Sequence, residues 1–243
     1  LRFESEDMTM KNINWYPGHM KKTRELIEAN LKLVDLVIEL LDARIPHSSR
    51  NPIISELTKH KKRIIVLNKS DLADENRTMA WIKHFEREGS RAIPIDSMRG
   101  KGISKLYTVL DAFQRERDET KRNMRALRIM IVGVPNVGKS SLINRLTGHK
   151  SAKTGNKPGV TRGKQWITIK NGMQLLDTPG ILWPKFEDPD VGLNLAFCGN
   201  IRDEVLDIQD LGYELVGILA KEYPDKLSER YRLERIFTEK LDN

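Results

Sequence analysis

The run Gly133-Val134-Pro135-Asn136-Val137-Gly138-Lys139-Ser140 decides the fold, because it matches the phosphate-loop pattern G-x-x-x-x-G-K-S/T. An apolar strand is predicted just before it, over residues 127–132, and a helix is predicted to begin near Lys139. In that setting consecutive backbone N–H groups can face phosphate oxygens, and the lysine adds a positive charge. We therefore expect a nucleotide phosphate site formed by Asn136, Val137, Gly138, Lys139, Ser140 and Ser141.

Two downstream segments complete a candidate site for Mg²⁺ and the terminal phosphate. Ser140 offers its hydroxyl to the magnesium ion, and Asp177, which follows a predicted strand, can reach it through a water. In the same Asp177-Thr178-Pro179-Gly180 segment, the Gly180 amide is expected to face the γ-phosphate. Thr161 can complete the magnesium shell, although an ordinary polar loop is the alternative there.

The segment Asn68-Lys69-Ser70-Asp71 predicts a guanine-binding site at the end of a strand over residues 63–67. The Asp71 carboxylate can accept hydrogen bonds from guanine N1–H and the 2-amino group, a pair of donors that adenine lacks. Asn68 and Lys69 would brace the loop and cover the base. Asp96 and Ser97, after the next strand, would support the base edge. The expected substrate and product are therefore GTP and GDP.

The order of these motifs is informative, because Asp71 precedes Gly133 whereas ordinary small GTPases carry the phosphate loop first. A sheet can bring the same loops together in either order. We predict an α/β fold: a circularly permuted P-loop GTPase domain with a mostly parallel sheet and helices on both faces, followed by a small all-α domain. The expected boundaries are a disordered or expression-derived extension (1–10), the GTPase domain (11–186) and a helical C-terminal domain, complete or truncated (187–243).

Hydrophobic periodicity predicts the individual elements. Helices are expected over 19–33, 53–59, 75–88, 103–117, 191–197 and 204–223, and strands over 34–41, 63–67 and 92–95, with a connector over 118–124. A hairpin of strands 165–169 and 173–176 is expected around Asn171-Gly172.

Composition limits the class of protein. The one cysteine, Cys198, excludes a disulfide framework or a cysteine-rich zinc site within the chain and fits a reducing cytosol. The most apolar run, residues 31–41, is too short to cross a bilayer. The net charge of +8 is uneven, since acidic residues outnumber basic ones over 185–243. Basic clusters such as 59–63 and 115–128 favour a polyanionic partner, although solvated helix faces are the alternative.

Five segments together resemble the circularly permuted GTPases of ribosome assembly. They are Trp15-Tyr16-Pro17-Gly18-His19-Met20, Asp42-Ala43-Arg44-Ile45-Pro46 with Arg50-Asn51-Pro52, residues 68–71, residues 133–141 and residues 177–184. The resemblance implies a cytoplasmic GTPase that binds a precursor of the large ribosomal subunit, contacts ribosomal RNA and ribosomal proteins, and leaves after hydrolysis. No membrane or DNA partner is expected.

Two further residues enter through this resemblance. Ile181 stands where ordinary GTPases carry the glutamine that orients the attacking water, and His19 resembles the family's candidate for that role. The alternative is that His19 starts a helix or touches RNA. Asn136 resembles an asparagine that holds K⁺ beside the phosphates in potassium-stimulated GTPases, whereas a loop asparagine bonding its own backbone is the alternative.

Two other functions stay open from the sequence. One is a regulatory switch that acts on membranes or protein effectors, although no lipidation signal is present in these residues. The other is a nucleotide-sensing RNA-binding protein with negligible hydrolysis, which Ile181 keeps in consideration. Turnover measured with and without ribosomal particles would separate this sensor from an assembly GTPase.

Overall fold

The computed structural model describes residues 17–121, 125–148, 166–176, 178, 180, 182, 188–201 and 207–233, with side chains from residue 24 onward and not at residues 120 and 121. In chain order the elements are α1 (Pro17–Leu31), β1 (Leu36–Asp42), α2 (Pro52–Thr58), β2 (Lys62–Asn68), the 3-10 turn η1 (Ser70–Leu72), α3 (Glu75–Arg87), β3 (Arg91–Pro94), α4 (Ile103–Lys121), β4 (Arg128–Val132), α5 (Lys139–Thr147), β5 (Trp166–Thr168), the 3-10 turn η2 (Lys170–Gly172), β6 (Gln174–Leu176), α6 (Pro189–Phe197), α7 (Ile208–Glu222) and α8 (Pro224–Tyr231).

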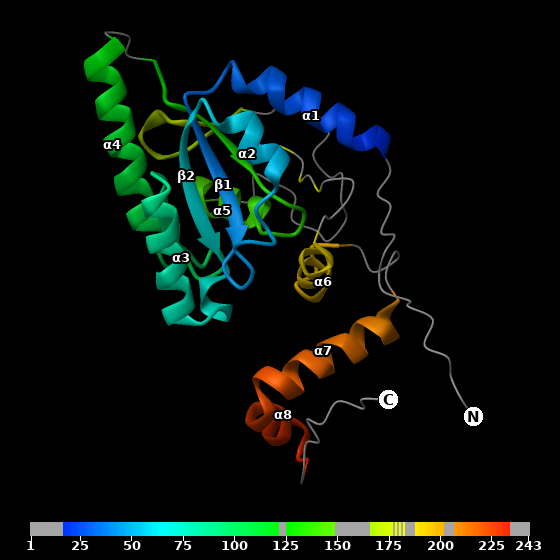
Figure 1. Cartoon of the computed structure of the whole chain (residues 1–243). Coiled ribbons are helices and arrows are strands. Elements are labelled where there is room, and N and C mark those ends of the chain that lie inside the picture. Colours follow the sequence, from blue (N-terminus) through cyan, green and yellow to red (C-terminus); the bar gives the residue numbers. More distant parts are fainter. Residues whose placement is uncertain are drawn as a thin grey trace.

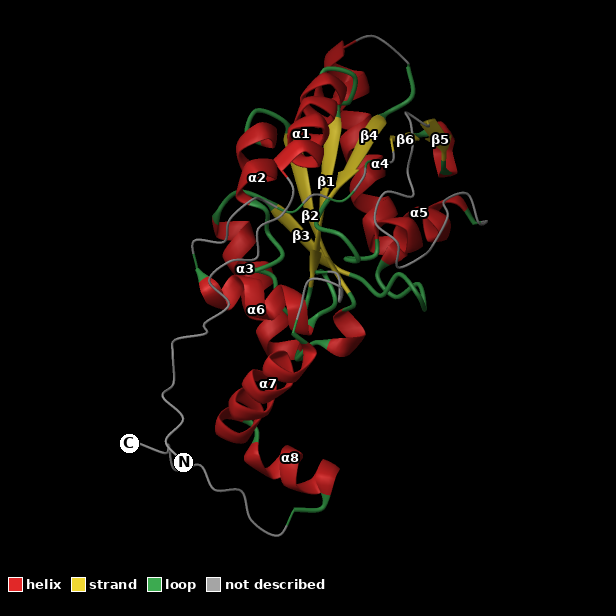
Figure 2. Ribbon diagram, turned by 90° about the vertical axis from the view of Figure 1, so that its right-hand side faces the viewer, coloured by secondary structure: helices red, strands yellow, loops and turns green. Residues whose placement is uncertain are grey.

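The described strands form one sheet in the order β3-β2-β1-β4-β6-β5. Figure 1 shows β1 beside β2, and Figure 2 shows these strands with the rest of the sheet. Neighbouring strands run parallel except for β5, which pairs antiparallel with β6. Strand β1 lies between β2 and β4, and all of its residues are buried, as expected for a parallel strand covered on both faces. The strands β1 to β3, which come first in the chain, thus extend the sheet beside β4, and this confirms the predicted permuted α/β fold.

Alternation along β1 divides the core between two faces of the sheet. Ile38 and Leu40 belong to a cluster that includes Leu106 of α4 and Leu142 of α5. Val37 belongs to a second cluster, with side chains of α1 and α2, and Leu41 to a third, with side chains of α3. Figure 2 shows α1, α2 and α3 on one side of the sheet and α4 and α5 on the other.

Two predicted segments can be compared directly with the structure: the connector after residue 117 and the hairpin around Asn171. The connector expected over 118–124 was wrong for residues 118–121, which continue α4. Polar character alone does not end a helix, and Arg117 forms ion pairs with Asp35 and Asp118 in this part of α4. The hairpin is confirmed, because Asn171 and Gly172 both have positive φ (62° and 72°), as a tight turn between antiparallel strands requires.

The helices after the sheet differ in burial. Val191, Leu195 and Ala196 of α6 lie in the same core cluster as the sheet. In contrast, α7 and α8 expose large side chains that include Ile208, Tyr213 and Tyr231. α7 begins after Asp207, whose carboxylate accepts hydrogen bonds from the amides of Gln209 and Asp210. A bilayer-spanning helix, long and apolar enough for that role, does not occur among the described residues.

Candidate functional site

The carboxyl ends of three central strands place the predicted motifs at one edge of the sheet. Asp42, the last residue of β1, is in register with Asn68, the last residue of β2. Strand β4 ends at Val132, and Gly133 follows so close to β1 that an added Cβ would lie 2.5 Å from the Leu40 carbonyl oxygen. Ligands of open α/β sheets bind at this edge.

The phosphate loop has the backbone that its glycines predict. Gly138 has a φ of 102°, and a Cβ there would lie 2.2 Å from Asn68 Nδ2, so a larger residue does not fit. Helix α5 begins at the next residue, with Ser140 and Ser141 in its first turn. The Lys139 side chain reaches back to the start of the loop, where its Nζ donates to the carbonyl oxygens of Gly133 (3.2 Å) and Val134 (2.7 Å).

Gly180 is brought to the same loop although it lies far along the chain. A Cβ on Gly180 would be 2.6 Å from Lys139 Nζ and 2.8 Å from the Pro135 backbone. This glycine therefore lies against the phosphate-loop lysine, as the predicted roles of the two residues require.

The guanine motif is joined to the phosphate loop by two side chains. Asn68 Nδ2 donates to the Val137 carbonyl oxygen (2.8 Å), while its Oδ1 accepts from the Ser97 amide (3.2 Å). Lys69 has a left-handed backbone (φ 59°), and its Nζ donates to the Asn136 carbonyl oxygen (2.9 Å). The three loops that follow β2, β3 and β4 are thus held together by direct hydrogen bonds.

The two acidic residues expected near the base have different surroundings. The Asp71 side chain, on η1, is 24% exposed, and its nearest described cation is Arg99, at 3.9 Å. Asp96 is buried, and its Oδ1 accepts from the amides of Met98 and Arg99 (2.9 and 3.0 Å). The Asp96 carboxylate therefore organises its own turn, whereas Asp71 remains accessible to a ligand.

Sequence reasoning assigned no role to Asp42 or Arg44, which it used only as part of the family resemblance. The Asp42 carboxylate is fully buried and accepts from Arg44 Nε (2.9 Å) and Nη2 (2.7 Å), and it also pairs with Lys69 Nζ (2.9 Å). Burial alone would raise the pKa of Asp42, but the hydrogen bonds and charges of these two cations hold it below its usual value.

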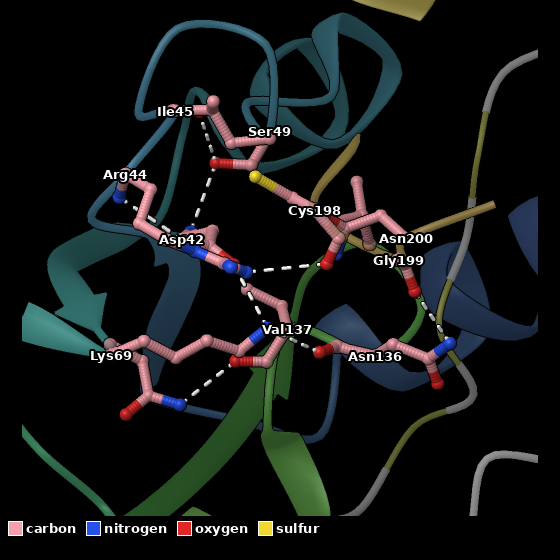
Figure 3. A network of polar contacts seen from close by, with 12 residues as sticks. Asp42, Arg44, Ile45, Ser49, Lys69, Asn136, Val137, Cys198, Gly199 and Asn200 are labelled. Carbon is pink, nitrogen blue, oxygen red and sulfur yellow. Dashed lines mark hydrogen bonds and ion pairs between the residues drawn. The ribbon is translucent and has the colours of Figure 1, made fainter. Parts of the chain in front are cut away.

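The turn that follows α6 is a second feature that sequence reasoning missed. Arg44 Nη2 donates to the Cys198 carbonyl oxygen (3.2 Å), Asn136 Nδ2 to that of Gly199 (2.8 Å), and Asn200 Nδ2 to that of Pro135 (2.7 Å). Figure 3 shows how this turn faces the phosphate loop and the pair of Asp42 and Lys69. The asparagine proposed as a potassium ligand thus bonds this turn and not its own backbone.

Some predicted residues lie outside the part that the structure describes. Thr161, Asp177 and Ile181 are among these, and for His19 only the backbone, in the first turn of α1, is described. No group of three or more His, Cys, Asp or Glu side chains suited to a metal occurs among the described residues. Of the expected magnesium set, the structure therefore places Ser140 alone, beside Lys139.

Fold and site together define a P-loop GTPase with circularly permuted motifs, and the comparisons with known proteins agree. Residues 128–237 match the family model described as 50S ribosome-binding GTPase. Ribosome biogenesis GTPase A of Priestia megaterium is 48% identical over 229 residues, 92% of this chain and 80% of that protein. Ribosome biogenesis GTPase A of Thermotoga maritima is 35% identical over 209 residues, which are 86% of this chain and 74% of that protein. The chain belongs to the ribosome biogenesis GTPase A family.

A solved structure supports the same assignment. The crystal structure of GNP-bound YlqF from T. maritima matches with a TM-score of 0.60 and 29% identity, over 87% of this chain and 83% of that one. The GDP-bound structure of the same protein matches with a TM-score of 0.59. Both similarities extend over most of the chain, 87% and 85% of it.

Proposed function

We propose that this protein binds and hydrolyses GTP as an assembly factor of the large (50S) ribosomal subunit, joining precursor particles in the GTP state and leaving after hydrolysis. The observation that carries the proposal is the joining of base motif and phosphate loop through Asn68 and Val137. One nucleotide can reach both loops only if they are adjacent. The ribosomal role rests on membership of the family, whose relatives bear the name ribosome biogenesis GTPase A.

The site residues follow the nucleotide from base to terminal phosphate. Asp71 would accept from guanine, and Lys139 would contact the outer phosphates. Ser140, Thr161 and Asp177 would hold Mg²⁺, which neutralises charge on the β- and γ-phosphates. Two observations fit this set: neither Gly138 nor Gly180 has room for a side chain, and a Cβ on Gly180 would lie 2.6 Å from the Lys139 ammonium.

For hydrolysis we propose His19 as the residue that orients the attacking water, because Ile181 cannot do so. K⁺ would bind beside Asn136. Since the amide nitrogen of Asn136 donates to Gly199, the cation would take the amide oxygen as its ligand.

The RNA contact that the family implies has a candidate surface at the amino end of the sheet. The basic clusters 59–63 and 115–128 converge there around a hollow of about 320 Å³, whose lining includes Lys32, His60, Lys61, Lys62, Arg117 and Arg125. Some of this charge is already balanced, since Asp35 pairs with Arg117 and Arg125. The remainder would attract RNA phosphates, a contact that orients the protein but does not read sequence.

We further propose that residues 187–243 form a helical C-terminal domain, with α6 as its attachment to the sheet and α7 and α8 offering the exposed part of its surface. Such a domain can supply shape-specific contacts that charge alone does not. A role in ribosome assembly makes the cytoplasm the proposed place of action.

Sedimentation tests the proposal directly. Purified protein is mixed with mature or precursor large subunits, in GDP or in a non-hydrolysable GTP analogue, at physiological salt. We expect co-sedimentation with precursors to be strongest with the GTP analogue, and turnover to rise when particles are added. Equal binding in both nucleotide states, or to unrelated RNA, would contradict an assembly role. Negligible turnover with particles would favour a nucleotide sensor.

A further inference from the structure

One buried carboxylate connects the guanine motif to the turn after α6. The Lys69 ammonium lies 2.9 Å from Asp42 Oδ2 and 2.9 Å from the Asn136 carbonyl oxygen. A single cation therefore bridges the end of β1 and the phosphate loop. Lys69 is also the residue from which η1 begins, two positions before Asp71, so contacts that hold Lys69 also restrain the loop that carries Asp71.

The same carboxylate holds a second cation. Arg44 donates to both Asp42 oxygens, a two-point arrangement that fixes the guanidinium plane. From that position Arg44 Nη2 reaches the Cys198 carbonyl oxygen. With the Asp42 side chain fully buried, its one negative charge is shared between the two cations.

The geometry of the helix end explains why this carbonyl is available. α6 ends with Cys198 as C-cap and Gly199 in the left-handed region (φ 69°), and the Gly199 and Asn200 amides donate back to Ala196 and Leu195. This is a Schellman end, in which these two amides satisfy the carbonyl groups of Ala196 and Leu195, while the Cys198 carbonyl oxygen accepts from Arg44. Helix C-terminal carbonyls carry partial negative charge, so Arg44 is a suitable partner for Cys198.

The contacts close a ring. It runs from Lys69 to Asn136, from Asn136 Nδ2 to Gly199, back through Cys198 to Arg44, and through Asp42 to Lys69 (Figure 3). A displacement of the phosphate loop or of Lys69 changes contacts at the end of α6, and the reverse holds as well.

We propose that Asp42 and Arg44 are positioning residues for the nucleotide site: Asp42 sets Lys69 against the phosphate loop, and Arg44 ties that arrangement to the turn after α6. The inference rests on the proposed guanine-nucleotide site. It gives the C-terminal helices a direct route to the bound nucleotide, through the protein's own side chains.

A double-mutant cycle in the full chain tests the role of Asp42. Binding of a fluorescent GDP analogue is measured for wild type, Asp42→Asn, Lys69→Met and the double variant. Each single change should weaken binding about tenfold, the scale of one charge-assisted hydrogen bond. The double variant should be within about twofold of Lys69→Met, because Asp42 acts through Lys69.

The chain offers a matched control at the other end of β1. Asp35 is also largely buried and pairs with two arginines, Arg117 and Arg125, but it lies away from the nucleotide edge. Asp35→Asn should lower the unfolding temperature while leaving GDP affinity unchanged. If Asp35→Asn weakens GDP binding as much as Asp42→Asn does, the effect is general destabilisation and the proposal fails.

The outcomes separate this proposal from the site on which it rests. If Lys69→Met binds GDP normally, the guanine site itself is wrong. If Lys69→Met is weak but Asp42→Asn is normal, or if the two effects multiply, the site stands and the positioning role falls. Should Asp42→Asn fail to fold, Arg44→Gln gives the answer: we expect GDP dissociation about tenfold faster, and an unchanged rate would overturn the link to α6.

Discussion

Asn68 Nδ2 donates to the Val137 carbonyl oxygen at 2.8 Å, and the same asparagine accepts from the Ser97 amide. One side chain therefore holds together the loops after β2, β3 and β4. Their relative position is set by buried contacts within the protein, so nucleotide binding needs little reordering of these loops.

Lys139→Ala should abolish binding or hydrolysis of GTP without unfolding the domain. The ammonium contacts carbonyl oxygens of its own loop, and its loss removes the charge that outer phosphates require. Isothermal titration with GTP and thermal unfolding measure the two effects. Lys61→Ala, which loses a contact to the Val34 carbonyl far from this loop, is the control. Undiminished affinity and turnover in Lys139→Ala would show that the phosphate-loop assignment is wrong.

Asp71→Asn should weaken GTP binding and favour xanthine nucleotides, because an amide N–H can donate to the 2-oxo group that replaces the 2-amino group of guanine. Competition between GDP and XDP measures the preference. Asp74→Asn serves as control, since Asp74 caps α3 and an asparagine retains that cap. A guanine preference that survives in Asp71→Asn would remove Asp71 from the base site.

Asp42 should make part of the stability depend on pH. Its pKa is lowered in the folded protein, so the stabilisation is present above the ordinary aspartate pKa of about 3.9 and is lost as the pH falls through the lower folded value. Between about pH 6 and pH 3, the urea midpoint of wild type should fall further than that of Asp42→Asn. Parallel losses in the two proteins would contradict this contribution.

The parts of the site that could be predicted are those defined locally. The phosphate loop and the guanine motif have fixed spacings next to apolar strands, and parallel strands bring such loops to one edge. The hydrogen bond from Asn136 to the Gly199 carbonyl oxygen joins residues 63 apart, and no sequence pattern indicates that these two residues meet. Asp42 was equally hidden, because an acid at a strand end gains a role only when Lys69 and Arg44 pack against it.

His19→Ala should leave GTP affinity nearly intact and lower particle-stimulated turnover by roughly 10²-fold, the scale of losing a group that positions the attacking water. Single-turnover hydrolysis with saturating GTP separates this chemical effect from binding. His84→Ala, on α3 and outside the proposed RNA surface, is the control for loss of a histidine. Normal stimulated turnover in His19→Ala would assign the water to another group, such as one from the ribosomal particle.

Potassium dependence tests Asn136. If its amide oxygen holds a cation beside the phosphates, replacing K⁺ by Na⁺ should slow hydrolysis, and Asn136→Ala should hydrolyse GTP at one rate in both salts.

Asn136→Ala also loses the bond to Gly199, so loop displacement alone could lower its rate. Asn200→Ala controls for that effect, because it removes the neighbouring bond to the Pro135 carbonyl oxygen and leaves the Asn136 amide in place. We expect Asn200→Ala to retain the ratio of rates in K⁺ and Na⁺ even if both rates fall. Equal rates of the wild-type protein in the two salts would exclude a potassium site, and a lost ratio in Asn200→Ala would assign the salt effect to the loop contacts with the turn after α6.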